Sequence, residues 1–469
     1  MRAGEVPVWL RMTSSATPVL PSDALTVLTE PPRHGGLQQP APFRSVASWV
    51  LYDLANTIFS MGVVSLFFSL WIRDRVGPER ADSVYTLITA FSMGIIFILS
   101  PLLGAMSDRA RKRMPFLIVS TLLCVGFTLL LGRAGYVGTI VAFIVANAAY
   151  QAGLQFYDSL LVEVTTEANR GRIGGIGVGI GYLGSYIAVA FGLILGTGDK
   201  ALLFTLIAIA FLVFAIPCFL FVRERGNPNP GKVFDFGVIA SSAKQTIRTL
   251  REGERYPGLV RFLVGRVFYT DAINTVISVM TLYAVNVAVY SGLAKDAAEK
   301  TAQLIMMSAI TFAVIGGFVW GWIVDRIGPK RTLDIVLFLW IVTFALASAM
   351  GLLGLPIITL WIVAAMAGVG LGGIWSADRP LMLRLTPPDR VGEFYGLYGM
   401  VGRFSAISGP VIWAGVTTLT VRRMHLPVQV GQGYGVAALL LMVVLSWWIL
   451  RRVDDTPRNW EALDHLSDA

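Results

Sequence analysis

The chain has 469 residues, of which 55% are hydrophobic and only 14% are charged, and its mean hydropathy is +0.67. Soluble proteins carry about 25% charged residues, so this composition excludes a large water-soluble enzyme. A bilayer-spanning helix needs about 20 mostly apolar residues, and the chain can supply roughly ten or more such helices. We therefore expect a protein that crosses the membrane many times.

The formal net charge of +9 does not indicate a nucleic-acid partner. The basic residues lie in short clusters between apolar runs, and Lys and Arg in such loops orient membrane proteins. The two cysteines, Cys124 and Cys218, each lie inside an apolar run, which favours a packing role over a disulfide or a thiolate metal site. We expect no cofactor and no metal.

Residues 1–43 hold seven prolines and no apolar stretch long enough for a signal peptide, so we predict a disordered tail there. Twelve apolar segments follow, and each is predicted to be a transmembrane helix. The predicted spans are 45–72, 83–105, 114–133, 136–160, 173–196, 201–222, 259–285, 301–324, 332–354, 356–377, 391–419 and 433–450. They form one six-helix bundle at 44–222 and a second at 259–450.

A polar linker at 223–258 separates the two predicted bundles, and a cytoplasmic tail at 451–469 follows the last span. Within the linker, apolar residues recur at helical spacing against basic ones: Phe236, Ile239, Ala243, Ile247 and Leu250. Such a basic amphipathic helix either lies on the membrane surface or is a solvated helix that joins the bundles. The sequence favours neither reading.

The distribution of Lys and Arg predicts the orientation in the membrane. With twelve spans, both ends of the chain lie on one side. Of the 38 Lys and Arg residues, 26 fall on that side, 9 fall on the other, and Arg266, Arg379 and Arg403 lie within spans or at their ends. Because loops rich in Lys and Arg stay in the cytoplasm, we expect cytoplasmic termini and the plasma (inner) membrane as the location.

Three polar patterns occur twice at a nearly constant offset. The segment Gly104 to Arg113 after the second span matches Gly321 to Arg331 after the eighth, at 217 residues between Asp108 and Asp325. Asp53, Asn56, Thr57 and Ser60 match Asp271, Asn274, Thr275 and Ser278, at 218. Asp158, Thr166 and Arg170 match Asp378, Thr386 and Arg390, at 220. The repeats predict two halves of the same polarity, as in secondary transporters whose site lies between the halves.

The pattern Gly-x-x-x-Asp-Arg-x-x-x-Lys/Arg after the second span, repeated after the eighth, resembles the signature loop of the major facilitator superfamily. Further segments resemble its branch of vacuolar amino-acid effluxers from fungal autophagy, namely Trp49-Val-Leu-Tyr52-Asp53-Leu-Ala-Asn56, Gly181-Tyr182-Leu-Gly184-Ser185, Tyr269-Thr-Asp271-Ala-Ile-Asn274-Thr275 and Phe394-Tyr-Gly396-Leu-Tyr398. The resemblance covers roughly residues 45–450. It implies an all-α membrane protein with twelve transmembrane helices in two pseudo-twofold halves. Ala110 replaces the glycine that is usual in the first loop.

The same resemblance implies a gate on the cytoplasmic face. Asp108 and Asp325 are expected to dock against the start of a helix in the opposite half, where a carboxylate is favoured. Arg109 and Arg326 are expected to reach the acids that end spans four and ten. The expected gate residues are Gly104, Asp108, Arg109, Arg113, Asp158, Gly321, Asp325, Arg326 and Asp378.

A carboxylate within an apolar span costs about 2.5 to 3.5 kcal/mol on insertion scales, so Asp53 and Asp271 are the first candidates for chemistry. Helical spacing puts the polar residues near each aspartate on one helix face. If the repeat is symmetric, the two polar stripes face each other across a central cavity. One reading is that one or both aspartates gain and lose a proton during transport. The other is structural, with each aspartate capping an interrupted helix or pairing with Arg266.

Span four presents Asn147, Gln151 and Gln155 at intervals of four, and the counterparts of the last two are Leu371 and Trp375. A polar wall opposite an apolar one suits a small amphipathic metabolite such as a neutral amino acid. Alternatively, the amides bond neighbouring helices. The residues expected to bind substrate or couple protons are Asp53, Asn56, Ser60, Asp271, Asn274, Ser278, Gln151, Gln155, Trp375 and Arg266.

We therefore expect a secondary active transporter that moves a small polar or amphipathic metabolite by proton-linked alternating access, and the resemblance implies that it exports amino acids. The expected partners are this solute, protons and the lipid bilayer, and the chain is expected to be a monomer. The first alternative is a broad-specificity exporter of toxic compounds, which needs a larger cavity lined by aromatic residues and Met. The second is a membrane receptor or scaffold without transport. The sequence has no nucleophile with its base and no P-loop pattern, so we expect no enzyme.

Overall fold

The computed structural model describes residues 37, 39–196, 198–226, 231, 258–387 and 390–456. Most of the predicted tail at 1–43, most of the linker at 223–258 and most of the final tail lie outside the described residues. The amphipathic helix predicted within the linker is among these.

The described chain is helical, and no strand occurs among the residues that the structure describes. The first part of the chain contains α2 Phe43–Phe59, η2 Ser60–Phe67, α3 Phe68–Val76, α4 Pro78–Arg109, α5 Met114–Leu130, α6 Gly135–Ser159, α7 Leu161–Val164, η3 Glu167–Asn169, α8 Arg170–Leu195 and α9 Lys200–Phe221. The second part contains α11 Leu259–Tyr290, α12 Lys295–Ile327, α13 Pro329–Leu353, α14 Ile358–Arg384, α15 Val391–Thr418, η5 Leu419–Arg423 and α16 Val428–Leu450.

Within the described ranges, eleven helices are long and apolar enough to cross a membrane, and α5 is a shorter apolar helix of 17 residues. Each of the twelve predicted spans corresponds to one of these helices, so the all-α membrane class is confirmed. The first span is continuous from Phe43 to Val76 but changes to a π-helix over Ser60–Phe67. Such wider turns inside α-helices are frequent at functional sites.

At two tight connections, a glycine ends one helix and a proline starts the next. Gly77 between α3 and α4 has a φ of 81°, and Gly328 between α12 and α13 has a φ of 87°. A side chain is strained in this left-handed region, so glycine ends the helix there. Pro78 and Pro329 then start the next helix, where the missing N–H has no helical partner to lose.

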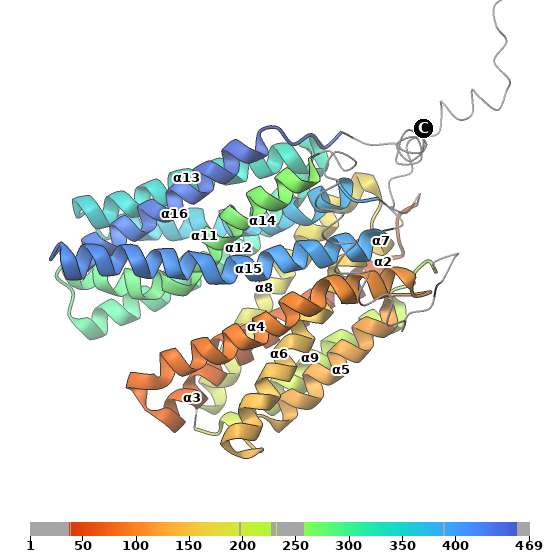
Figure 1. Cartoon of the computed structure of the whole chain (residues 1–469), viewed down its shortest axis with the longest axis horizontal. Coiled ribbons are helices and arrows are strands. Elements are labelled where there is room, and N and C mark those ends of the chain that lie inside the picture. The colour runs from red at the N-terminus through yellow and green to blue at the C-terminus, as the bar shows by residue number, and fades with distance from the viewer. Residues whose placement is uncertain are drawn as a thin grey trace, which may run out of the picture. The chain divides into compact units, whose positions relative to one another are not determined.

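The helices pack in two groups with the same internal pattern (Figure 1). In residues 43–226, called here the N-terminal half, α2 packs on α8 and α9, α5 on α6 and α9, and α4 on α6. In residues 258–456, the C-terminal half, α11 packs on α15 and α16, α13 on α14 and α16, and α12 on α14. Each half has a hydrophobic core of its own.

A further feature occurs once in each half, although the sequence patterns did not reveal it. Glu224, just after α9, accepts hydrogen bonds from the backbone N–H groups of Arg113 and Met114 at 2.7 and 2.9 Å. Asp455, just after α16, accepts one from Lys330 N at 3.1 Å. In both halves an acid after the sixth helix therefore caps the start of the third, where a negative charge is favoured.

The most extensive contacts between the halves are those of α4 with α15 and of α8 with α12, and α14 also packs on α8 and α15 on α6. Glycines allow the backbones to approach closely along the first two pairs. A Cβ atom added to Gly104 would lie 2.5 Å from Gly392 O, and one added to Gly175 would lie 2.5 Å from Gly321 Cα. We call these two contacts the glycine seams. The side of the molecule at which α2 begins and α16 ends is called the terminal face.

Candidate functional site: a charged cavity between the halves

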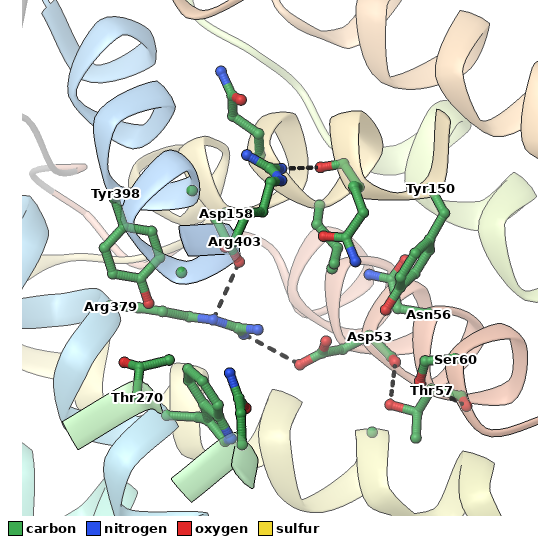
Figure 2. Close-up of a pocket in the computed structure, with 18 of the residues that line it drawn as sticks. Asp53, Asn56, Thr57, Ser60, Tyr150, Asp158, Thr270, Arg379, Tyr398 and Arg403 are labelled. Atoms are coloured by element: carbon green, nitrogen blue, oxygen red, sulfur yellow. Dashed lines mark hydrogen bonds and ion pairs between the residues drawn. The ribbon is translucent and has the colours of Figure 1, made fainter. Parts of the chain in front are cut away.

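A cavity of about 510 Å³ lies between the halves, within the range of small-molecule sites. Residues of α2, η2, α4, α6 and α8 line it from one half, and residues of α11, α14 and α15 line it from the other. Figure 2 shows how these side chains meet. Of the ten residues predicted to bind substrate or couple protons, eight line the cavity: Asp53, Asn56, Ser60, Gln151, Gln155, Arg266, Asn274 and Trp375.

The polar stripe of α2 faces the cavity as its spacing predicts. Thr57 Oγ1 donates to Asp53 O at 3.1 Å, and Ser60 Oγ donates to Thr57 O at 3.2 Å. Asn56 is only 2% exposed, and neither its amide nitrogen nor its oxygen has a hydrogen-bond partner in the described part of the chain. Because buried polar groups are normally satisfied, this amide is available to a ligand.

Aromatic packing fixes α2 against α6. The ring of Tyr157 stacks on Trp49 at 4.6 Å and on Tyr52 at 5.1 Å between centroids. The Tyr52 hydroxyl also hydrogen-bonds to Thr121 Oγ1 at 2.6 Å. Since Asp53 and Asp158 follow Tyr52 and Tyr157 directly in the chain, this stack holds the two carboxylates in fixed positions.

Arg379 of α14 bridges two carboxylates of the opposite half. Its Nη1 atom lies 3.3 Å from Asp53 Oδ2, and its Nε atom lies 3.1 Å from Asp158 Oδ1 (Figure 2). All three side chains are nearly buried. In the sequence Arg379 lies within or at the end of a span, and no motif there predicts a role for it.

A second buried ion pair lies wholly within the C-terminal half. Arg266 Nε lies 3.1 Å from Asp378 Oδ2, and Arg266 Nη1 donates to Tyr398 O at 2.9 Å. The Tyr398 hydroxyl donates to the same carboxylate at 3.0 Å, and its ring lies 3.5 Å from the guanidinium carbon. Arg266 is therefore held by Asp378, and the alternative pairing of Arg266 with Asp53 or Asp271 is wrong.

The two halves differ in how they supply these arginines. Asp158 is the counterpart of Asp378 in the repeat, but the counterpart of Arg266, 218 residues earlier, is Ser48. Asp158 therefore has no such arginine in its own half and binds Arg379 of the other. The two related aspartates thus differ in their partners. Asp378 pairs with Arg266 within its own half, whereas Asp158 pairs with Arg379 across the halves.

Asp271 does not line the cavity, in contrast to the symmetric expectation. It is fully buried, accepts a hydrogen bond from Gly409 N at 2.6 Å, and binds the Ser408 hydroxyl. These contacts join α11 to α15 beside Pro410, which interrupts the hydrogen bonds of the helix. Ser278 also lies outside the cavity lining, and its hydroxyl donates to Asn274 O at 2.9 Å. Asp271 therefore has the contacts expected if its role is structural and not the binding of substrate or protons.

The amides of α6 divide between packing and the cavity. Asn147 donates to Ser92 Oγ at 3.1 Å and bonds to the neighbouring α4, as the packing alternative predicts. Gln155 donates to Ser100 O at 3.0 Å, but its Oε1 atom has no partner among the described residues. Gln151 and Trp375 both line the cavity.

Arg403 is the second arginine to which the sequence analysis gave no role. It lies on α15, donates through Nη2 to Gln151 O at 2.7 Å, and binds the Ser100 hydroxyl through Nη1. Arg379 and Arg403 share one sequence signal, a permanent positive charge near or inside an apolar span. The insertion cost that singled out the aspartates applies equally to arginine.

The loop aspartates dock at the terminal face as the resemblance implies. Asp108 accepts hydrogen bonds from Gly392 N and Glu393 N at 2.7 and 2.6 Å, where α15 begins. Asp325 accepts them from Gly171 N and Arg172 N at 2.7 and 3.0 Å, where α8 begins.

Close approach of the backbones makes both docks possible, because Gly104 and Gly321 lie on the glycine seams. A Cβ atom at Gly321 would lie 2.8 Å from Gly171 O. The role of these contacts as a gate stays a prediction.

The predicted ion pairs of Arg109 and Arg326 with Asp158 and Asp378 are wrong. Asp158 binds Arg379, and Asp378 binds Arg266, and both of these arginines are buried. The guanidinium of Arg326 instead lies 3.7 Å from the ring centroid of Trp322, and Arg113 pairs with Asp108 at 3.1 Å. The two acids are already bound by buried arginines, so they are not the counter-charges of Arg109 and Arg326.

The chain matches a family described as "Vacuole effluxer Atg22 like" over residues 75–454. An uncharacterized MFS-type transporter, YxiO, of Bacillus subtilis (strain 168) is 25% identical over 401 residues, which cover 80% of this chain and 88% of that protein. Autophagy-related protein 22 of Gibberella zeae is 29% identical over 269 residues, which cover 51% of this chain and 39% of that protein.

Solved structures of major facilitator transporters share the fold. A bacterial homologue of the iron transporter ferroportin in an outward-facing state has a TM-score of 0.65 at 17% identity, covering 89% of this chain and 98% of that one. The proton:xylose symporter XylE has a TM-score of 0.63 at 15% identity, covering 90% of this chain and 97% of that one. At these identities the likeness establishes the fold alone.

Proposed function

The chain belongs to the Atg22-like family of vacuole effluxers, which are multi-pass membrane transporters of the major facilitator type, and we propose that it moves a small polar metabolite by proton-linked alternating access. An amino acid is the solute that we propose first. The observation that carries the proposal is the bridge that Arg379 forms between Asp53 and Asp158 across the two halves.

The charge of this bridge supports proton coupling. Two carboxylates and one guanidinium carry a formal charge of −1 when both acids are ionised. A buried net charge is costly, so one proton on Asp53 or Asp158 neutralises the group and weakens one ion pair. The bridge can thus bind a single proton and, by doing so, loosen the contact between the halves.

Further charged and aromatic groups lie around the bridge. Arg403 lines the same cavity and carries a positive charge, whereas Arg266 is paired with Asp378. Four tyrosines also line the cavity, namely Tyr150, Tyr182, Tyr395 and Tyr398. The side chain of Tyr157 lies against the bridge, with its ring centroid 5.8 Å from the Arg379 guanidinium.

Contacts at the terminal face support alternating access. The docks of Asp108 and Asp325, the glycine seams and the Arg379 bridge all join one half to the other. Opening this face requires that these contacts break together. Charge-assisted hydrogen bonds to helix starts are strong enough to stabilise a closed face and few enough to be broken in a transport cycle.

The cavity supports a small charged or zwitterionic solute over a large apolar drug. Carboxylates, guanidinium groups and unsatisfied amides lie around its walls, and Met93 is the single methionine among its described lining residues. A broad-specificity exporter is expected to have a larger cavity lined by aromatic residues and Met. The described lining has Trp375 and four tyrosines but one methionine.

The orientation and location are also proposals. The excess of Lys and Arg on the terminal face supports cytoplasmic termini, and we propose the plasma (inner) membrane and a monomer. Protease access to terminal tags in sealed vesicles tests the orientation.

Reconstituted protein tests the proposed function directly. We expect amino-acid uptake into proteoliposomes to follow an imposed pH gradient and to move protons, which an entrapped pH-sensitive dye reports. Asp53→Asn and Asp158→Asn should abolish gradient-driven accumulation while solute exchange without a gradient persists. Asp74→Asn is the matched control, because the Asp74 side chain is exposed, pairs with Lys200 and lies near the end of α3, outside the cavity lining. Wild-type accumulation in both bridge variants would refute proton coupling through these acids.

A further inference from the structure

Arg403 is a buried cation with no carboxylate partner among the residues that the structure describes. It is only 5% exposed, and it lines the central cavity (Figure 2). Its two hydrogen-bond acceptors are neutral, the Gln151 carbonyl and the Ser100 hydroxyl, and no carboxylate of the described chain lies within ion-pair distance. The cavity's other two arginines, Arg266 and Arg379, are each bound by acids.

The nearby charges do not supply the missing partner. Asp158 attracts the Arg403 guanidinium electrostatically and Arg266 repels it. Both of these groups are already held in ion pairs, with Arg379 and Asp378 respectively. A buried charge that has only neutral partners is costly unless a counter-charge arrives.

The backbone of α15 leaves space for this guanidinium. A Cβ atom added to Gly399 would lie 2.7 Å from Arg403 Nη1, so any larger residue would displace the group. Gly402 leaves similar space for Arg266, whose Nη1 atom would lie 3.1 Å from an added Cβ. Arg403 is thus held along its helix, and its Nε–H group has no hydrogen-bond partner in the described part of the chain.

The donors that remain match a carboxylate. A guanidinium has five N–H groups in a planar fork, and two nitrogens of Arg403 are used by neutral oxygens. The Nε–H and a second terminal N–H can bind the two oxygens of one carboxylate, which is the geometry that arginine prefers.

We propose that Arg403 binds the carboxylate of the transported solute, so that the substrates are small metabolites with a carboxylate group. This inference rests on the proposed transport function and narrows its substrate class. In such a complex, the unpartnered Gln155 Oε1 and the Asn56 amide are available to the rest of the solute. A positively charged amine, where the solute has one, is attracted to the acids of the Arg379 bridge.

Arg403 also joins α15 to α4 and α6, so its role could be purely structural. In that case the protein would bind an acid and the corresponding amide with equal affinity. A carboxylate subsite must distinguish them, because replacing the carboxylate by an amide removes a charge-assisted pair of hydrogen bonds. The expected discrimination is about tenfold or more in affinity.

Ligand-dependent thermal shift of the purified full-length protein tests the subsite, because a ligand that binds the folded state raises the melting temperature by mass action. The probes are alanine, leucine and phenylalanine, their amides, and the corresponding acids without the amino group. The proteins are the wild type, Arg403→Gln, Arg403→Lys, and Arg422→Gln as the matched control on an exposed arginine. The measured quantity is the ratio of acid to amide affinity within each protein, which does not depend on its yield.

We expect the wild type and Arg422→Gln to prefer the acid about tenfold or more, Arg403→Lys to retain part of this preference, and Arg403→Gln to lose it. Binding of the acids without an amino group, but not of amino acids, with the same dependence on Arg403 would support the subsite and refute the amino-acid part of the proposed function. Equal affinity for acids and amides, or an unchanged ratio in Arg403→Gln, would overturn the subsite and leave the proposed function intact. If no probe in the three series binds at millimolar concentration, both proposals fail.

Discussion

Arg379 and Asp158 belong to different halves of the protein, yet Arg379 Nε lies 3.1 Å from Asp158 Oδ1 in a nearly buried ion pair. The same guanidinium also contacts Asp53 at 3.3 Å. One residue of the C-terminal half therefore controls the charge balance of two acids in the other half. A change in the protonation of either acid acts directly on the contact between the halves.

Removal of Arg379 should be more harmful than removal of the whole ion pair. Arg379→Gln leaves two buried carboxylates without a counter-charge, and breaking a buried pair from one side typically costs about 3 to 5 kcal/mol. We expect a large fall in melting temperature and no transport. The triple variant Arg379→Gln with Asp53→Asn and Asp158→Asn, which removes the charge of both acids as well, should recover most of the stability but not proton-driven accumulation. Equal instability of the single and triple variants would contradict this account of the bridge.

Asp271 should behave as a structural residue although it is the repeat counterpart of Asp53. Its carboxylate accepts hydrogen bonds from Gly409 N and the Ser408 hydroxyl and does not line the cavity. Asp271→Ala leaves a buried donor without an acceptor, which costs about 1 to 3 kcal/mol. We expect a lower melting temperature in detergent, while protein that folds retains the proton-to-solute ratio of the wild type. Loss of coupling in folded Asp271→Ala would contradict this assignment.

The difference between Asp53 and Asp271 shows why the sequence predicted the helix faces better than the partners. The repeat preserves the spacing of the polar residues on α2 and α11, so it preserves the face that they occupy. Gly409 and Pro410 lie within α15 next to Asp271, and the Gly409 N–H binds Asp271. The corresponding stretch of α8, Ala188 to Ala190, contains neither glycine nor proline, so Asp53 stays available to the cavity.

Hydropathy and the spacing of polar residues predicted the spans and eight residues of the cavity lining, because both depend on local periodicity. The roles of Arg379 and Arg403 depend on which helices of the two halves lie opposite each other, and local periodicity carries no such information. The same limit explains why the acids ending spans four and ten were assigned to the loop arginines. A pairing between halves becomes visible only in three dimensions.

The glycine seam between α8 and α12 offers a test of closure at the terminal face. A Cβ atom at Gly175 would lie 2.5 Å from Gly321 Cα and closer still to Gly317 O, and these backbone atoms cannot move aside. Gly175→Ala should therefore hold the terminal face apart. Its neighbour Gly174 has no atom within 4 Å of an added Cβ, so Gly174→Ala is the matched control on the same helix.

Thiol labelling can measure this opening. A cysteine introduced at Asn56 in the cavity reports access, since the native Cys124 and Cys218 are buried. We expect a membrane-impermeant reagent applied at the terminal face to label it faster in Gly175→Ala than in Gly174→Ala. Identical labelling rates in Gly175→Ala and Gly174→Ala would show that the close contact of α8 with α12 is not needed to close the terminal face.

The two aspartate docks should stabilise the closed terminal face by similar amounts. Asp108 and Asp325 each accept two backbone N–H groups where a helix of the opposite half begins, as an N-cap does, and the loss of such a cap costs about 0.5 to 2 kcal/mol. Asp108→Ala and Asp325→Ala should each raise the labelling of the Asn56 cysteine from the terminal face, and the double variant should raise it further. Because these hydrogen bonds break only when the terminal face opens, neither Asp108→Ala nor Asp325→Ala should increase the labelling rate from the opposite face above that of the protein with both aspartates. An increase from both faces at once would mean that the aspartates hold the fold together and do not act as a gate.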